Sequence, residues 1–243
     1  MRQFGLIGFP LSHSFSKKYF SEKFVREQRS DCAYELFPLA AIEELPALLA
    51  AHPQLEGLNV TIPYKKQVLP FLHTRAFPEG LEACNCIRIQ NGQLTGYNTD
   101  AIGFEKSLLP LLQSHHRAAL VLGNGGAAEA VIFVLKKLGL RVEVVSRQLH
   151  NRSTLTYPDI TADTLAECHV IVNTTPLGMY PHTDTCPAIP YAALGPQHLL
   201  YDLVYNPAQT LFLQKGAEQG AVVKNGLEML ELQAEASWEI WNA

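Results

Sequence analysis

The chain has 243 residues, of which 47% are hydrophobic and 17% charged, and its formal net charge is −4. At roughly 150 residues per domain, this length allows one or two domains. The hydrophobic content excludes a disordered chain. The mildly acidic balance argues against a general nucleic-acid-binding protein, which carries a strongly basic face. We therefore expect a globular protein without a nucleic-acid partner.

Five cysteines are scattered along the chain, an odd number that does not fit the disulfide framework of a secreted protein. Cys84 and Cys86 lack the spacing and the second ligand pair of a zinc site, and we interpret them as buried small residues. No apolar run approaches the ~20 residues that span a bilayer. The first residues do not resemble a signal peptide. We expect a cytoplasmic protein without a membrane partner.

The first hundred residues alternate between strand-like and helix-like segments. In chain order, the apolar patterns predict a strand at 4–8, a helix at 16–28, a strand at 34–39, a helix at 41–51 and a strand at 58–62. Asn91-Gly92 is a strong hairpin signal between strands at 86–90 and 93–96. This half is therefore predicted to be an α/β unit with at least one antiparallel strand.

After residue 100 the pattern restarts. It predicts a helix at 101–113, a strand at 118–122, a Gly-rich turn, a helix at 127–138, and strands at 141–145, 169–173, 199–204 and 221–224. Strands that alternate with helices around a Gly-rich turn indicate a doubly wound parallel sheet of the dinucleotide-binding type.

A last helix is predicted at 226–241, with one apolar face. Four glutamates on this helix form a separate acidic stripe, which we interpret as a solvated face: Glu228, Glu231, Glu235 and Glu239. Gln233 borders the apolar face. Its amide is either a satisfied edge residue or a substrate contact, and the helix pattern alone favours the first.

The Gly-rich turn at 123–128, Gly-Asn-Gly-Gly-Ala-Ala, follows a strand and opens a helix, as the G-x-G-x-x-A fingerprint requires. Gly123 allows a tight turn, Gly125 lets backbone approach a pyrophosphate, and Ala128 allows close packing. The free N–H groups of a helix start favour an anion. We predict a dinucleotide site. The alternatives are an ordinary strand–helix turn and an adenosylmethionine-binding turn.

The end of the next strand distinguishes the two nicotinamide cofactors. An NAD site carries an acid there for the ribose hydroxyl, whereas an NADP site carries a cation. This chain has Ser146-Arg147. The planar fork of Arg147 fits a 2′-phosphate, and Ser146 can donate as well. The pair predicts NADP rather than NAD and argues against a methyltransferase. The alternative for Arg147 is a solvated surface residue.

Three polar clusters lie outside the Gly-rich half, at Gly8 to Ser16, Asn59 to Lys65 and Asn98 to Asp100. The second cluster follows a predicted strand, at the carboxyl end where ligands bind in open α/β sheets. Each cluster alone has an ordinary explanation as a loop or a helix cap.

Together with segments 83–87, 173–179, 201–207 and 225–233, these clusters resemble the shikimate dehydrogenase family in order and spacing. The resemblance implies the reversible NADP-dependent reduction of 3-dehydroshikimate to shikimate, in aromatic amino-acid synthesis. It implies a substrate domain of residues 1–100 and 225–243, an NADP-binding Rossmann domain of residues 101–224, and a cleft between these two α/β domains. The partner is then a small-molecule substrate, and we expect a monomer or homodimer.

The resemblance also assigns roles to single residues. Lys65 and Asp100 match the catalytic pair, and Ser14 and Ser16 match the pair that binds the substrate carboxylate. The other expected substrate contacts are Thr61, Asn85, Tyr205 and Gln233. The expected cofactor contacts are Gly123, Asn124, Gly125, Gly126, Ala127, Ser146, Arg147, Thr174 and Gly226. No metal is expected, because the nicotinamide carries the hydride.

The sequence departs from the family pattern at three places. Lys17 stands where proline is usual and Cys86 where threonine is usual, and both changes leave the chemistry intact. The usual phosphate clamp has a second arginine four residues after the first, whereas here Asn151 stands at that position and Arg152 one beyond. This last departure leaves the strictness of the NADP preference open.

Hydride reduction of a ketone leaves an alkoxide that needs a proton, and the reverse reaction needs a base. A lysine ammonium can supply that proton, so we expect Lys65 to transfer it and Asp100 to orient Lys65. Two alternatives remain. One is a quinate-accepting or NAD-preferring relative. The other is a nonenzymatic NADP-binding sensor, which would be expected to lack Lys65 or Asp100.

Overall fold

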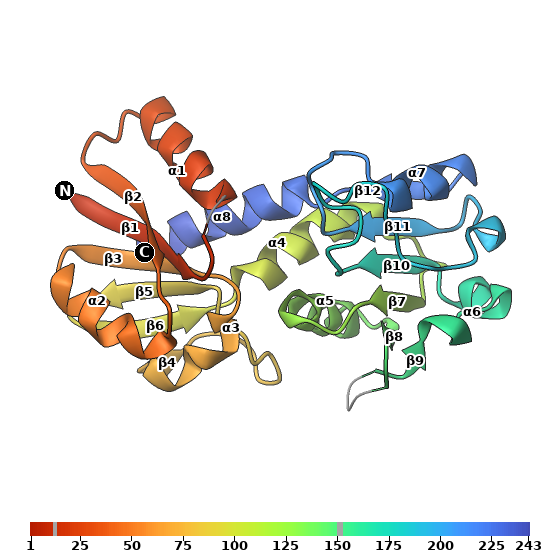
Figure 1. The fold of residues 1–243 in the computed structure, drawn as a ribbon, viewed down its shortest axis with the longest axis horizontal. Coiled ribbons are helices and arrows are strands. Elements are labelled where there is room, and N and C mark those ends of the chain that lie inside the picture. Colours follow the sequence, from red (N-terminus) through yellow and green to blue (C-terminus); the bar gives the residue numbers. More distant parts are fainter. Residues whose placement is uncertain (12–13, 150–152) are drawn as a thin grey trace. The chain divides into compact units, whose positions relative to one another are not determined.

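The computed structural model describes residues 1–11, 14–149 and 153–243. It divides into two compact units, Met1–Ile102 with Glu231–Ala243, and Gly103–Leu230. Both divisions fall inside helices, because α4 (Thr99–Leu108) and α8 (Leu227–Trp241) each run from one unit into the other. Each unit is built around one six-stranded sheet with helices, so the predicted α/β class is confirmed (Figure 1).

The sheet of the first unit has the strand order β2-β1-β3-β5-β6-β4. Its strands are β1 (Arg2–Gly8), β2 (Cys32–Pro38), β3 (Leu55–Val60), β4 (Thr74–Arg75), β5 (Cys86–Gln90) and β6 (Gln93–Tyr97). The first three are parallel, and β5 runs antiparallel to both β3 and β6. Asn91 and Gly92 have φ angles of 52° and 74°. Two left-handed residues in succession are what a tight hairpin turn needs, so the predicted hairpin is confirmed.

Helices cover both faces of this sheet. They are α1 (Phe15–Arg26), α2 (Leu45–Ala51), α3 (Tyr64–Gln67) and the end of α8. Side chains alternate along β1, so Phe4 packs with Phe20 of α1 and Trp241 of α8, whereas Ile7 packs with Leu45 of α2. Because β1 and β3 are parallel neighbours, the loops after both strands lie at the same edge of the sheet.

The acidic stripe of the last helix is only partly a solvated face. Glu235 pairs with the buried ammonium of Lys23 on α1 at 2.7 Å and accepts a hydrogen bond from Tyr19. The prediction was wrong at this position because a helix pattern does not show which helix packs beside it. The pairing ties α1 to α8, the two helices that carry Ser16 and Gln233.

The sheet of the second unit is entirely parallel. Its strands are β7 (Ala118–Leu122), β8 (Arg141–Ser146), β9 (Leu155–Thr156), β10 (Val170–Asn173), β11 (Leu199–Asp202) and β12 (Val222–Lys224). The spatial order is β9-β8-β7-β10-β11-β12. This is the 3-2-1-4-5-6 order of the dinucleotide-binding fold. The predicted Rossmann-type sheet is confirmed.

Helices α5 (Gly126–Lys137), α6 (Ala162–Glu167) and α7 (Leu211–Glu218) pack with α4 around this sheet. Leu165 and Phe212 lie in one apolar layer with alternate residues of β7, whereas Phe104 of α4 packs edge-on against Tyr201 at 5.1 Å. Helix α4 is shorter than the predicted 101–113, because Pro110 lacks an amide hydrogen and only a short 3-10 turn follows Leu108. In the described ranges, none of the helices has the length and apolarity to cross a membrane.

Four histidines lie together just before strands of the second sheet. The ring centroids of His115 and His116 are 4.3 Å apart, and His169 lies 5.5 Å from His115 and 5.3 Å from His198. The amide of Gln113 donates to Nδ1 of His116 at 3.0 Å. Because Nδ1 accepts this bond, the ring is held neutral, and adding a proton there would break it. No group of three or more His, Cys, Asp or Glu side chains in the described part of the chain could hold a metal ion.

This cluster predicts a loss of stability in mild acid. Burial and the neighbouring imidazoles lower the pKa of His116 and of His169 below the ordinary 6.5. The unfolded chain therefore binds more protons near pH 6, and the free energy of unfolding falls as the pH drops through 6.5. We expect the melting temperature to decrease from pH 8 to pH 6, and to decrease less in His116→Gln. Equal decreases in both proteins would contradict this expectation.

Candidate functional site

The predicted substrate residues of the first unit gather at one edge of its sheet. Ile7 pairs with Val60, and Asn59 pairs with Cys86, which in turn pairs with Tyr97. The carboxyl ends of β1, β3 and β6 therefore lie beside the amino end of β5. The loops and helix starts at this edge carry Ser14, Ser16, Thr61, Lys65, Asn85 and Asp100.

Lys65 and Asp100 form an ion pair at this edge. Nζ of Lys65 donates to Oδ2 of Asp100 at 2.6 Å, and the two side chains are 18% and 16% exposed. Asp100 lies in the first turn of α4, where Oδ1 of Asn98 accepts from the amide of Ala101 at 3.0 Å and so caps the helix. The pair is half-buried, which orients the ammonium and leaves part of it accessible to a reacting group.

Ser14 and Ser16 lie at the start of α1. Ser14 is the cap residue, and its Oγ accepts from the amide of Lys17 at 3.3 Å. The hydroxyl of Tyr34, near Ser16, is buried and donates to Oδ1 of Asn59 at 2.9 Å. Burial raises the pKa of Tyr34, so its hydroxyl stays protonated. Tyr34 therefore lies next to a predicted substrate residue, but it was not itself predicted as part of the site.

A buried hydrogen-bond network connects two other predicted substrate residues, Asn85 and Gln233. Thr99 donates its amide to Oδ1 of Asn85 at 2.6 Å, and Nδ2 of Asn85 donates to Oγ1 of Thr99 at 3.0 Å. The Thr99 hydroxyl also donates to Oε1 of Gln233 at 3.3 Å and lies 3.2 Å from Oγ of Ser237. Asn85, Asp100 and Gln233 are therefore held in one rigid arrangement, because Thr99 precedes Asp100 in the chain.

Thr61 directly follows β3, which ends at Val60 rather than at the predicted residue 62. Its amide donates to the carbonyl of Ile7 at 3.0 Å. A Cβ on Gly8 would lie 2.4 Å from Cγ2 of Thr61, so only glycine allows the loop after β1 to pass this close. The sequence had marked Gly8 only as the start of a polar cluster.

In the second unit, a cavity of about 860 Å³ lies at the carboxyl ends of β7, β8 and β10. The residues that line it are Gly123, Asn124, Gly125, Ser146, Arg147, Gln148, Tyr157, Thr174, Thr175, Pro176 and Leu177. Gly126 and Ala127 form the first turn of α5 beside it. The cavity therefore joins three of the predicted cofactor segments.

The glycines of this cavity fit a dinucleotide. Gly123 has a φ of 108°, and a Cβ there would lie 2.7 Å from Oγ1 of Thr174, so the position requires glycine. A Cβ on Gly125 would meet no atom within 4 Å, so its backbone faces open space. The start of α5 follows directly, with the N–H groups that favour a pyrophosphate.

Ser146 is the last residue of β8 and Arg147 follows it, and both line the same cavity. Arg147 is exposed, and the hydroxyl of Ser146 donates to the carbonyl of Gln148. Tyr157 lines this cavity together with Arg147. Burial raises the pKa of Tyr157, and the positive charge of Arg147 opposes that rise. Asn151 and Arg152, the residues at the second position of the phosphate clamp, lie outside the described residues.

The remaining predicted contacts lie at the ends of β10 and β11. Thr174 donates its hydroxyl to the carbonyl of Leu122 at 2.8 Å, beside the Gly-rich turn. Gly226 approaches the residue after β11 so closely that a Cβ would lie 2.2 Å from the carbonyl oxygen of Leu203. Tyr205 follows β11 and is partly exposed. Thr174 therefore belongs to the cavity wall, and Gly226 to the segment that enters α8.

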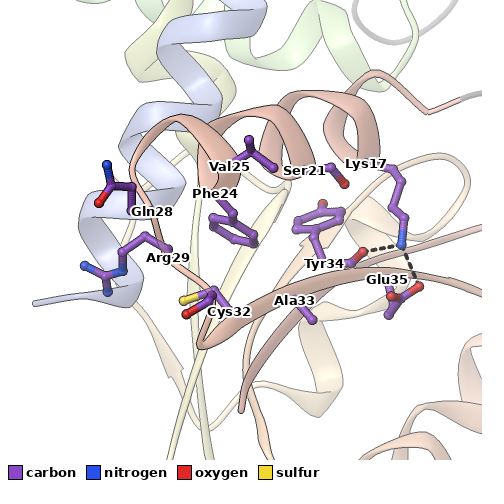
Figure 2. A pocket seen from close by; sticks show the side chains of 11 residues that line it. Lys17, Ser21, Phe24, Val25, Gln28, Arg29, Cys32, Ala33, Tyr34 and Glu35 are labelled. Carbon is purple, nitrogen blue, oxygen red and sulfur yellow. Dashed lines mark hydrogen bonds and ion pairs between the residues drawn. The ribbon is translucent and has the colours of Figure 1, made fainter.

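A second cavity, of about 590 Å³, lies between α1 and the edge strand β2 (Figure 2). Figure 2 shows Lys17 reaching across it to Glu35 and to the carbonyl of Tyr34. The predicted substrate and cofactor residues are not among the residues that line it.

Known proteins resemble this chain over nearly its whole length. Residues 6–87 match the family model described as the shikimate dehydrogenase substrate binding domain. The chain is 34% identical to the protein named shikimate dehydrogenase (NADP(+)) of Desulforamulus reducens, over 98% of this chain and 88% of that one.

Solved structures of related enzymes share the fold, and two of them were determined with bound cofactors. Shikimate 5-dehydrogenase from Thermus thermophilus, in complex with NADP(H) and shikimate, superposes with a TM-score of 0.85 at 29% identity, covering 99% of this chain and 93% of that one. Quinate dehydrogenase from Corynebacterium glutamicum, in complex with NAD, superposes with a TM-score of 0.86 at 26% identity, with the same coverage of 99% and 93%.

Proposed function

This chain belongs to the shikimate dehydrogenase family, and on that premise we propose that it reduces 3-dehydroshikimate reversibly to shikimate with NADPH, using Lys65 as the proton-transfer group. The observation that carries the proposal is the half-buried ion pair between Lys65 and Asp100, at the sheet edge where the other predicted substrate residues gather. A nonenzymatic sensor would have no need of this pair.

The second unit would hold the cofactor through the Gly-rich turn, Thr174 and Arg147. When bound, the reduced nicotinamide supplies the hydride. The start of α5 offers N–H groups to the pyrophosphate, and Arg147 offers its planar guanidinium to the 2′-phosphate. We assign Gly226 to the nicotinamide end of the cofactor.

Lys65 would hold the proton that the substrate oxygen receives. Hydride addition to the ketone leaves an alkoxide. The ammonium of Lys65 stabilises the negative charge of this alkoxide and gives a proton to its oxygen. Asp100, 2.6 Å from Nζ, fixes the direction of the ammonium through a charge-assisted hydrogen bond. The transfer leaves Lys65 as a neutral amine. In the reverse direction this amine takes the proton of the substrate hydroxyl and becomes the ammonium again, while Asp100 holds the Lys65 side chain in place.

The substrate would be oriented by its carboxylate and its hydroxyls. We assign the carboxylate to Ser14, Ser16 and Tyr205, and the hydroxyls to Thr61, Asn85 and Gln233. The network through Thr99 supports this assignment, because it fixes Asn85 and Gln233 before any substrate arrives. Rigid side chains of this kind lower the cost of ordering a polar ligand.

Replacing Ser14 and Ser16 together with alanine is expected to raise the KM for shikimate roughly tenfold or more, because hydrogen bonds to a carboxylate are charge-assisted. The KM for NADP should change much less, because both serines lie in the first unit. Ser21→Ala, a change on the same helix, serves as the control. Equal increases in both constants would point to a folding defect or a wrong assignment.

The second candidate is a relative that accepts quinate or prefers NAD, since the quinate dehydrogenase structure with NAD has a similar fold. Specificity constants for shikimate and quinate, each with NADP and NAD, separate the two. The proposed function requires shikimate with NADP to give the highest of the four values. A higher value for quinate or for NAD would favour the second candidate.

We propose a cytoplasmic monomer or homodimer that has a small-molecule substrate as its partner. The five cysteines support a reducing compartment, since all of them are free thiols and Cys84, Cys86 and Cys168 are buried.

A further inference from the structure

Asp202 is a buried carboxylate that the proposed mechanism does not use. It is the last residue of β11, and its side chain and backbone are 0% exposed. Oδ1 accepts from Nδ2 of Asn173 at 2.9 Å and from the amide of Val204 at 3.0 Å, and Oδ2 accepts from Oγ1 of Thr210 at 2.6 Å. These three donors are neutral, so no opposite charge among them compensates the cost of burying the carboxylate. The presence of Asp202 at this position therefore needs an explanation other than an ion pair.

One of these partners leads directly to the wall of the cofactor cavity. Oδ1 of Asn173 accepts from the amide of Thr175 at 3.0 Å and from its hydroxyl at 2.6 Å. Nδ2 of Asn173 also lies 3.4 Å from the carbonyl of Leu177. The side chain of Asn173 therefore closes the turn from Thr174 to Leu177, and all four residues of this turn line the cavity.

The carboxylate determines which way the Asn173 amide points. An ionised carboxylate only accepts hydrogen bonds, so Asn173 must turn its NH₂ group toward Asp202 and its oxygen toward Thr175. If the amide were reversed, its NH₂ group would meet the two donors of Thr175. A second chain of hydrogen bonds runs from Asp202 to Gly226. Asp202 accepts from the amide of Val204, and the carbonyl of Val204 accepts from the amide of Gly226 at 3.2 Å.

We propose that Asp202 is a positioning residue for cofactor binding, which acts through Asn173 on the Thr174–Leu177 turn and through Val204 on Gly226. This inference rests on the proposed function, because it assigns the cavity to NADP. It predicts that the effect of Asp202 is on cofactor affinity, since its partners all lie in the second unit.

The test is a direct titration of the purified full-length protein with NADP+, without substrate. Asp202→Asn keeps the shape but replaces a charged acceptor with a neutral amide oxygen, which holds the Asn173 side chain and the Val204 amide less firmly. We expect the Kd for NADP+ to rise about tenfold. The KM for shikimate should stay within about twofold. Asp202 acts on Thr175 through Asn173. The loss of binding free energy in the double variant Asp202→Asn/Thr175→Ala should therefore be smaller than the sum of the losses in the two single variants.

Tyr201→Phe is the matched control. Tyr201 precedes Asp202 on β11 and is equally buried. Its hydroxyl shares a hydrogen bond of 2.7 Å with Ser107, which is not one of the residues that Asp202 or Asn173 binds. This variant should melt at a lower temperature and bind NADP+ like the wild type. If Asp202→Asn does not fold, Thr210→Val removes one donor to the carboxylate from outside the cavity, and it should weaken NADP+ binding about threefold.

The outcomes separate this inference from the proposed function. Wild-type protein that binds no NADP+ would overturn both. Wild-type protein that binds NADP+, with unchanged affinity in Asp202→Asn, or in Thr210→Val where the first variant is unfolded, would overturn the positioning role alone. Additive losses in the double variant would also overturn it, because they would mean that Asp202 and Thr175 act independently.

Discussion

Replacing Lys65 with alanine is expected to lower turnover roughly 10²- to 10⁴-fold, the usual contribution of a positioned acid–base group. The affinity for NADP+ should change little, because Lys65 lies in the first unit and the cofactor cavity lies in the second. The ion pair at 2.6 Å also predicts that Asp100→Asn lowers turnover, since a neutral amide holds the ammonium less firmly.

Lys66→Ala is the control for this experiment. Lys66 is the next residue on the same short helix, and it is exposed. Removing it deletes the same charge and the same aliphatic stem, while the ion pair between Lys65 and Asp100 keeps both of its members. Near-normal turnover in Lys65→Ala, or an equal loss in Lys66→Ala, would remove Lys65 from the chemistry.

Arg147→Ala is expected to weaken NADP+ binding about ten- to a hundredfold, which corresponds to one or two charge-assisted hydrogen bonds. NAD+ binding should be nearly unchanged, because only NADP+ carries the 2′-phosphate. Arg147→Lys should have an intermediate effect, since it keeps the charge and loses the planar fork.

Arg141→Ala is the matched control, because Arg141 opens the same strand β8 at the end opposite to Arg147. The readout is the ratio of specificity constants for NADP and NAD in all four proteins. A ratio that does not fall in Arg147→Ala would show that phosphate recognition depends on other residues, and the argument for NADP from the end of β8 would fail.

Local signals predicted much of the fold. The hairpin at Asn91-Gly92 and the turn at Gly123 were both predictable, because each needs a backbone conformation that few residues adopt. The two-residue strands β4 and β9 gave no pattern long enough to detect. Helix α4 was predicted too long, because the apolar pattern continues through the proline that ends it.

The candidate site was predicted only in part. The resemblance to the family identified Lys65 and Asp100, and the structure shows that they form an ion pair across 35 residues of sequence. It did not identify Tyr34, Thr99, Ser237 or Asp202. These residues support the site through hydrogen bonds between distant segments, such as the bond between Thr99 and Ser237, which are 138 positions apart in the sequence. Such contacts depend on strand register and helix packing, which no local pattern specifies.

The most direct test of the central claim is a single-turnover reaction with protein in excess over 3-dehydroshikimate, started with NADPH and followed by the loss of NADPH. This measurement separates the chemical step from product release. We predict stoichiometric formation of shikimate by the wild type, and a rate roughly 10²- to 10⁴-fold lower in Lys65→Ala at the same NADPH affinity. No shikimate in the wild type, or equal rates in the two proteins, would contradict the account.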